Sequence, residues 1–182
     1  MIDYLPISTD EFRKDTFNMV TALAITRRPK VIIETGCFRG NREEGLSTLH
    51  LSKLAEFIGG QFYSVDIEPE YIELAGELVS GSHINFACMD SVEFLSKFAG
   101  QIGLLYLDSC DIDLENPGPS QRHQLAELGA AWGKLSRDCL VLLDDCGMRH
   151  GGKGALSTPF LLERGFIELS KEGQYQRLFQ RI

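Results

Sequence analysis

The chain has 182 residues, of which 43% are hydrophobic and 24% are charged, and this size and composition are typical of one globular domain with a sizeable core. Its apolar runs are far too short to span a bilayer, so the sequence predicts no membrane partner. The formal net charge of −8 repels phosphate backbones and no basic cluster is longer than Arg27-Arg28, so nucleic acid is not an expected partner either.

Strand-like and helix-like segments alternate along the chain. A first helix, within residues 1–28, follows a capping box of Ser8 and Glu11 and is expected to pack on the sheet. The expected strands are 31–34, 61–65, 84–88, 102–107 and 139–143. The expected helices are 47–58, 69–78, one that follows Asp90-Ser91, and 121–135, and residues 111–119 form a turn-rich loop.

The end of the chain changes character. A helix is expected at 157–164, followed by two strands, 166–170 and 175–181, that predict an antiparallel hairpin. The alternation before it is the pattern of a doubly wound α/β sheet, and residues 1–182 contain no obvious interdomain linker. The sequence therefore predicts a single domain.

The first strand ends in Glu34 and opens into a loop that runs from Gly36 to Gly40. The carboxyl end of a parallel strand is where an open α/β sheet binds its ligand. The acid before the first glycine and the three residues between the glycines differ from the GxGxxG order of dinucleotide-binding folds. The loop therefore predicts a nucleotide-type pocket that is not built for a pyrophosphate.

These residues resemble the first motif of the class I S-adenosylmethionine-dependent methyltransferases, an acid followed by Gly-x-x-x-Gly. The segment Gly45-Leu46-Ser47-Thr48 is similar to a Gly-x-Ser-Thr element of small O-methyltransferases, although Asn41 to Glu44 lengthen the loop. The resemblance implies a Rossmann-like, seven-stranded, mostly parallel sheet whose C-terminal hairpin inserts the last strand beside the fifth. It also implies S-adenosylmethionine as the cofactor.

Several strand ends then supply an expected cofactor site. Gly36 and Gly40 let the backbone approach a ligand, and amides near the following helix favour a carboxylate. Asp66 can accept from both ribose hydroxyls and Ile67 can pack on the adenine, while Asp90 and Ser91 resemble the family's adenine-edge residues. The expected cofactor-binding residues are Glu34, Gly36, Cys37, Phe38, Gly40, Asp66, Ile67, Asp90, Ser91 and Asp108; the Cys37 thiol is given no chemistry.

The expected reaction centre lies at the ends of the fourth and fifth strands. Asp108 and the pair Asp144-Asp145 match the positions that hold a divalent metal in catechol-type O-methyltransferases, and carboxylates suit Mg²⁺. Such a metal could lower the pKa of an acceptor hydroxyl. Alternatively, Asp144-Asp145 only cap the next segment.

A general base is harder to assign from the sequence. The lysine that those enzymes carry after the strand 4 acid is missing, because Asp108 is followed by Ser109 and Cys110. His123 and His150 border the expected pocket, and His123 is ranked first, so Asp108 and His123 are the expected catalytic residues. Lys153 is expected to be a solvated charge.

The sequence thus predicts methyl transfer from S-adenosylmethionine to an oxygen of a small molecule, with nitrogen as the second choice. One alternative is a nicotinamide-dependent oxidoreductase, which the absent third glycine and absent Tyr-x-x-x-Lys pair disfavour. Another is a non-catalytic module that keeps the cofactor pocket.

Five cysteines without a CxxC pair indicate reduced thiols, and the start of the chain lacks the regions of a secretory signal, so a cytoplasmic protein is expected. Little chain precedes the first strand. Either the loop 111–120 or a second copy of the chain, as a homodimer, is therefore expected to help enclose the pocket.

Overall fold

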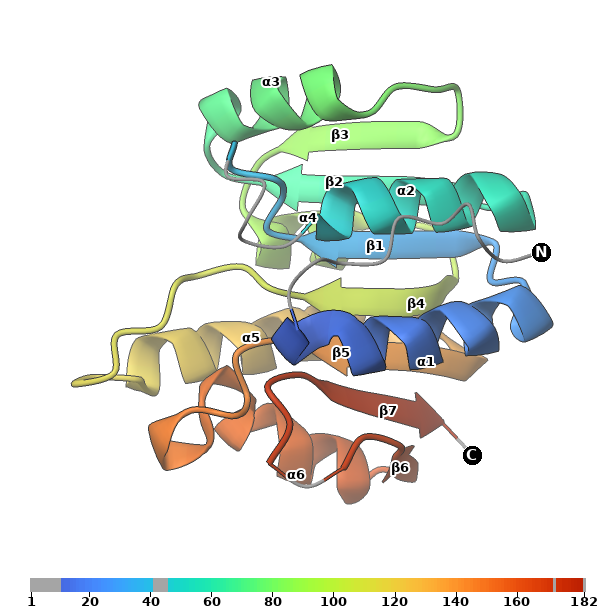
Figure 1. The fold of residues 1–182 in the computed structure, drawn as a ribbon. Helices are drawn as coiled ribbons and strands as arrows, with labels where there is room; N and C mark the ends of the chain where they lie inside the picture. The colour runs from blue at the N-terminus through green and yellow to red at the C-terminus, as the bar shows by residue number, and fades with distance from the viewer. Residues whose placement is uncertain (1–10, 41–45, 172, 182) are drawn as a thin grey trace.

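The computed structural model describes residues 11–40, 46–171 and 173–181, and its centre is a seven-stranded sheet in the order β3-β2-β1-β4-β5-β7-β6 (Figure 1). Strands β1 to β5 are parallel to one another, and β7 runs antiparallel to both β5 and β6. The strands are β1 Val31–Thr35, β2 Gln61–Asp66, β3 Ile84–Cys88, β4 Ile102–Leu107, β5 Leu135–Leu143, β6 Phe166–Glu168 and β7 Arg177–Arg181.

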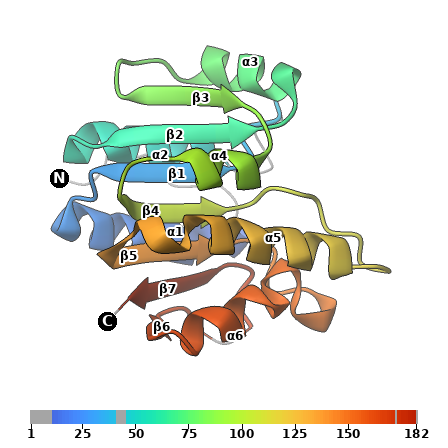
Figure 2. The same cartoon turned by 180° about the vertical axis from the view of Figure 1, so that it is seen from behind.

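Helices cover both faces of the sheet. In Figure 1, α1 and α2 lie in front of the central strands, and Figure 2 shows α4 and α5 on the opposite face. The helices are α1 Glu11–Arg27, α2 Ser47–Ile58, α3 Pro69–Leu78, α4 Ser91–Lys97, α5 Gly118–Ala131 and α6 Ser157–Leu162. Three short 3₁₀ turns, η1 Trp132–Lys134, η2 Arg149–Gly151 and η3 Lys153–Ala155, complete the described elements.

Alternating side chains of the strands build a core on each face. Ile32 and Leu104 pack with Phe17 of α1 and Leu51 of α2. Their chain neighbours, including Ile33 and Leu105, pack on the other face with Leu95 of α4 and Leu128 of α5. Because both faces are covered, the central strands are nearly continuous apolar runs, as parallel strands generally are.

The predicted fold class is confirmed, including the insertion of the last strand beside the fifth. Two elements differ most from their predicted boundaries. Helix α5 begins at Gly118 because Pro119 fits the first turn of a helix, and it stops at Ala131, before η1. Strand β5 then begins at Leu135 rather than residue 139, where Leu135 pairs with Ile102 before a shift in register.

The closing hairpin is also shorter than predicted, since β6 and β7 hold three and five residues. Of the predicted capping box, Ser8 lies outside the described residues. Within the part of the chain that is described, no helix combines the length and hydropathy needed to cross a membrane.

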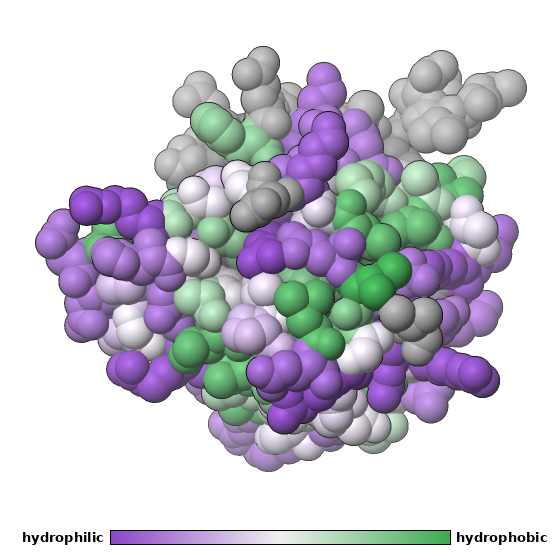
Figure 3. Space-filling view, turned by 90° about the horizontal axis from the view of Figure 1, so that it is seen from below, coloured by the Kyte–Doolittle hydropathy of each residue, from purple (hydrophilic) through white to green (hydrophobic). Residues whose placement is uncertain are grey.

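The face seen from below carries apolar side chains in several groups separated by hydrophilic ones (Figure 3). Leu162 and Ile167, in α6 and β6, are among the exposed large apolar residues. Single exposed residues of this kind are common on soluble domains.

Truncation of a buried aromatic residue tests this packing. Phe62 of β2 is fully buried among the α1 and α2 side chains, whereas Phe57 of α2 is 57% exposed. We expect Phe62→Ala to lower the free energy of unfolding by about 3–5 kcal/mol, because it opens a cavity. Phe57→Ala is the matched control and should change it by less than about 0.5 kcal/mol in urea denaturation. Equal losses in the two variants would contradict the assignment of Phe62 to the core.

Candidate functional site

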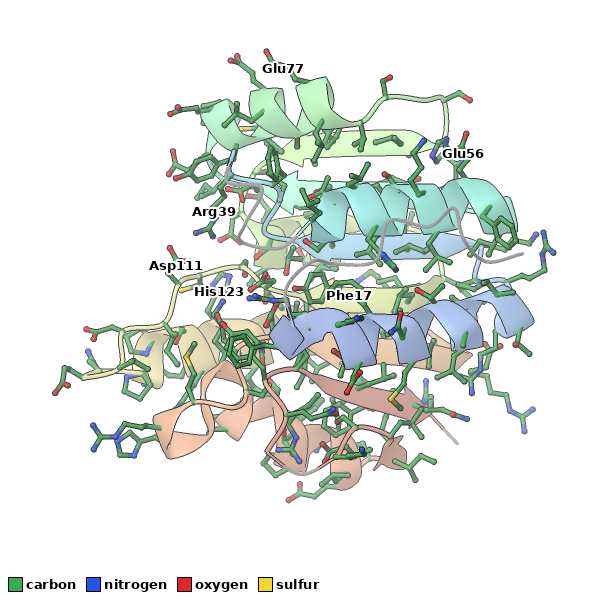
Figure 4. All side chains as sticks on the ribbon, in the orientation of Figure 1. Phe17, Arg39, Glu56, Glu77, Asp111 and His123 are labelled. Carbon is green, nitrogen blue, oxygen red and sulfur yellow. The ribbon has the colours of Figure 1, made fainter. Side chains whose placement is uncertain are left out.

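Two cavities lie side by side at the carboxyl edge of the parallel strands. Their volumes are about 460 and 410 Å³, and Gly36, Arg39 and Asp111 line both. We call them the first and the second cavity. Arg39 and Asp111 lie close together at this edge, with His123 nearby (Figure 4). The edge is where open α/β sheets bind ligands.

Gly36 is one of the three residues at which the two cavities meet. Its φ of +81° is a left-handed conformation, and an added Cβ would lie 2.6 Å from the carbonyl oxygen of Asp108. Its backbone N–H donates to the Val65 carbonyl at 2.8 Å. Only glycine therefore lets the loop after β1 pass this close to the end of β4.

Glu34 lies beneath the glycine loop rather than in either cavity. It is fully buried, and its Oε2 accepts from the hydroxyls of Thr48 at 2.8 Å and Ser64 at 2.7 Å. The Thr48 hydroxyl in turn accepts from the Phe38 backbone N–H at 2.9 Å. The carboxyl group therefore orients the loop through Thr48, and burial raises its pKa to about 7.

Asp66 ends β2 and lines the first cavity. Its two carboxylate oxygens accept from the backbone N–H groups of Cys37 at 3.1 Å and Glu68 at 3.0 Å. These bonds fix the carboxylate beside Ile67, which is 62% exposed and lines the same cavity. An oriented acid next to an exposed apolar side chain suits a ribose joined to a flat base.

Asp90, Ser91 and His123 also line the first cavity. Asp90 Oδ1 accepts from the Glu93 backbone N–H and so caps α4. The Ser91 hydroxyl is 3.0 Å from His123 Nε2. A hydrogen bond with Glu127 raises the pKa of His123, although burial opposes the shift.

The predicted catalytic residues do not share a cavity, because Asp108 lines the second cavity and His123 the first. Cys37 and Phe38 also line the second cavity, whereas Gly40 lines neither of the two. The Cys37 side chain is buried, and burial raises the pKa of its thiol. The inserted residues 41–44 lie outside the described part of the chain.

The acids at the ends of β4 and β5 form a connected network. Asp144 is fully buried; its Oδ2 accepts from Arg13 at 2.8 Å and from the Tyr106 hydroxyl, and its Oδ1 accepts from the Asp145 backbone N–H. Asp145 accepts from the Tyr175 hydroxyl through Oδ1. The Tyr106 hydroxyl oxygen also lies 3.1 Å from Asp108 Oδ2.

Lys153 completes this network, and its predicted exposure is wrong. Its side chain is 1% exposed, and Nζ lies 3.2 Å from Asp108 Oδ1 and 2.8 Å from Asp145 Oδ2. Burial alone would lower the pKa of Lys153, but the charges of Asp108 and Asp145 outweigh it and raise the pKa. An ammonium group thus bridges two of the three acids that were expected to hold a metal.

The three acids do not fit the expected Mg²⁺ site. Each of their carboxylate oxygens already contacts a hydroxyl, a backbone N–H or a cation of the chain, and Asp144 lines neither cavity. Among the described residues, no group of three or more His, Cys, Asp or Glu side chains is arranged to hold a metal ion. The structure therefore does not support the expectation of Mg²⁺.

Four site residues were missed by sequence reasoning, namely Arg13, Arg39, Lys153 and Tyr175. Arg13 and Tyr175 line the second cavity but come from distant parts of the chain, so no local motif joins them. Arg39 pairs with Asp111 at 2.7 Å and links the loops after β1 and β4. The one available signal was the run Gly151-Gly152-Lys153-Gly154, in which Gly151 and Gly152 both have a positive φ.

The chain resembles solved methyltransferases in fold. It matches the N-methyltransferase NodS from Bradyrhizobium japonicum WM9 with a TM-score of 0.61 and 17% identity, over 95% of this chain and 98% of NodS. The O-methyltransferase NovP gives 0.67 and 14% identity over 93% and 79% of the chains. The S-adenosylhomocysteine (SAH)-bound PaMTH1 of Podospora anserina gives 0.65 and 15% over 92% and 78%. No curated protein sequence matches the chain.

The fold is that of the class I S-adenosylmethionine-dependent methyltransferases. Residues 33–146 match the model of a family described as a methyltransferase domain, and the chain belongs to that family.

The buried Glu34 generates a prediction about pH. Its pKa is raised from 4.5 to about 7, so between these values the folded chain binds more protons than the unfolded chain and stability falls as the pH rises. Glu34→Gln keeps an acceptor for Thr48 and Ser64 and removes the titration. Relative to this variant, the wild type should lose on the order of 3 kcal/mol across that window in urea denaturation.

Glu56→Gln is the control, since Glu56 is an exposed residue of α2. Its pH profile should parallel the wild type. If Glu34→Gln also gave a parallel profile, Glu34 would not be the group that titrates here.

Proposed function

We propose that the chain transfers the methyl group of S-adenosylmethionine to an oxygen of a small molecule, with nitrogen as the second choice. The observation that carries the proposal is the pair of cavities that meet at Gly36, with Asp66 in the first and Asp108 in the second. One cavity suits a nucleoside and the other an acceptor, and a methyl group passes between them at the glycine loop.

The residues of the first cavity fit the nucleoside part of the cofactor. Asp66 would accept from the ribose hydroxyls, Ile67 would pack on the adenine, and Asp90 and Ser91 would lie at its edge. Where the first cavity meets the second, Gly36, Cys37 and Phe38 would flank the methionine part, and the absence of a Cβ at Gly36 leaves the necessary room. When bound, the cofactor supplies an electrophilic methyl group on a sulfonium sulfur.

Asp108 is the proposed base. Its side chain is 25% exposed, and burial and the neighbouring Asp144 charge raise its pKa, although Lys153 opposes the shift. A carboxylate with a raised pKa is a stronger base than an ordinary one. Asp108 would accept the proton of an acceptor hydroxyl as that oxygen takes the methyl group, and the bound cofactor would supply the sulfur as the leaving group.

A base at the acceptor cavity favours oxygen over nitrogen, because a hydroxyl must lose its proton to become a good nucleophile. The fold alone does not choose, since NovP is an O-methyltransferase and NodS an N-methyltransferase. His123 lines the nucleoside cavity, so we assign it to binding rather than to proton transfer.

Two further properties belong to this proposal. The five cysteines are unpaired, which supports a cytoplasmic location. A homodimer that encloses the second cavity would give twice the mass of one chain in light scattering.

Calorimetric titration tests the cofactor. We expect heat on adding S-adenosylmethionine and none on adding NAD. Asp66→Asn should weaken S-adenosylmethionine binding by about tenfold or more, because a charged acceptor of hydrogen bonds is lost. Asp138→Asn, in β5 at the opposite end of the sheet, should bind as the wild type does. Absence of heat with S-adenosylmethionine, or preference for NAD, would overturn the proposed cofactor.

A panel of hydroxylated small molecules tests the base. Asp108→Asn keeps a carbonyl oxygen for Lys153 and an amide N–H for the Tyr106 oxygen but cannot take a proton. We expect kcat to fall by about 10²–10⁴-fold while the Kd for S-adenosylmethionine changes by less than about threefold. Asp113→Asn, an exposed acid in the loop after β4, is the control. A module without catalysis would bind the cofactor and methylate nothing on the panel.

A further inference from the structure

The carboxylates at the ends of β4 and β5 outnumber the cations that compensate them. Three carboxylates, Asp108, Asp144 and Asp145, face two cations, Arg13 and Lys153. Arg13 contacts Asp144 at 2.8 Å and lies 3.8 Å from Asp145, whereas Lys153 joins Asp145 to Asp108. Lys153 is thus the cation that reaches the proposed base. Buried carboxylates of this kind are costly unless they are paired.

The chain is built to insert this lysine. The Lys153 backbone N–H donates to the Asp145 carbonyl at 2.9 Å, which turns the segment back onto the end of β5. Gly152 has a φ of +56°, and an added Cβ would overlap the Asp145 carbonyl oxygen. An added Cβ at Gly154 would overlap the Cys146 sulfur. The glycines on both sides of Lys153 are therefore required by the close approach.

A second contact holds the same turn from outside. Gln121 of α5 donates from Nε2 to the Gly152 carbonyl at 3.0 Å. The turn is thus bonded on one side to β5 and on the other to α5. These hydrogen bonds fix the backbone around Lys153, and its side chain is 1% exposed. Lys153 is therefore a permanent part of the site.

We propose that the Lys153 ammonium is the resident cation of this edge, in the position between Asp108 and Asp145 where a divalent metal would otherwise lie, and that it positions Asp108. The role in positioning the base rests on the proposed function; the role as cation does not. Lys153 is a positioning residue, because it is buried, contacts Asp108 and lines neither cavity.

Loss of Lys153 would leave the carboxylates of the network with too little positive charge. Without Lys153, three carboxylates would face Arg13 alone, which leaves two negative charges beside an empty space the size of a lysine side chain. Asp108 Oδ1 and Asp145 Oδ2 both lie within 3.2 Å of the vacated Nζ position. A divalent cation with carboxylate and water ligands can restore neutrality there. Removal of Lys153 should therefore create a metal site.

Manganese binding tests this, with electron paramagnetic resonance as the direct readout. We expect the wild type to bind no stoichiometric Mn²⁺ at submillimolar concentration, and its affinity for S-adenosylmethionine to be the same with a chelator or with added Mg²⁺. Lys153→Ala should lower the melting temperature and gain one Mn²⁺ per chain, with the melting temperature partly restored by the metal. Adding Asp145→Asn to Lys153→Ala should remove that binding.

Two controls make the result specific. Lys97→Ala removes an exposed lysine paired with Glu93 and should neither bind Mn²⁺ nor change the melting temperature by more than a degree or so. Lys153→Met fills the same space without a charge and should lose stability without the strong gain of Mn²⁺, because the side chain blocks the site.

Wild-type binding of one Mn²⁺ that Asp108→Asn abolishes would overturn the proposal, and this measurement needs no folded Lys153 variant. A folded Lys153→Ala with wild-type stability and no Mn²⁺ would also overturn it. These readouts do not depend on methyl transfer. If S-adenosylmethionine failed to bind while the manganese results held, the proposed function would fail and the resident cation would stand.

Discussion

The structure depends on the pairing of carboxylates that are buried where the central strands end. Parallel strands deliver their last residues to one edge, and in this chain β1, β2, β4 and β5 each end in or next to an acid. A charged group removed from water is destabilising unless a partner compensates it. Each acid therefore has a distinct solution: hydroxyls for Glu34, backbone N–H groups for Asp66, and cations for the acids after β4 and β5.

The two cavities at this edge differ in how their carboxylates are compensated. Hydroxyls and backbone N–H groups compensate a carboxylate without adding charge, so the first cavity keeps a fixed negative group for a ligand that donates hydrogen bonds. Around the second cavity, Arg13 and Lys153 bring full positive charges, and the net charge there is small. The Arg39–Asp111 pair lies between the two cavities and links the loops that form them.

Sequence reasoning was most reliable where the signal is local. The structure confirms several features that follow from neighbouring residues, namely the carboxyl ends of β3, β4 and β5, the acids after β4 and β5, and the helix cap at Asp90. Strands β1 and β2 each end one residue later than predicted. Lys153 could not be found in that way. A lysine among glycines is usually solvated, and its burial here depends on Asp108 and Asp145, of which the first is 45 residues away in the chain. The error over α5 and β5 has a similar origin, because pairing of Leu135 with Ile102 decides it.

A site with a resident ammonium and a site with a bound metal would select different acceptor molecules. A divalent metal keeps open positions that substrate oxygens fill, so it selects acceptors that can chelate, such as those with adjacent hydroxyls. The Lys153 ammonium is buried and directs its hydrogen bonds to Asp108 and Asp145, so it has no open position that the oxygens of an acceptor could fill. Under the proposed function, an acceptor is then recognised by the walls of the second cavity and by a single hydroxyl near Asp108. Adjacent hydroxyls are no longer needed, and the range of acceptors is limited by shape and hydrogen bonding instead.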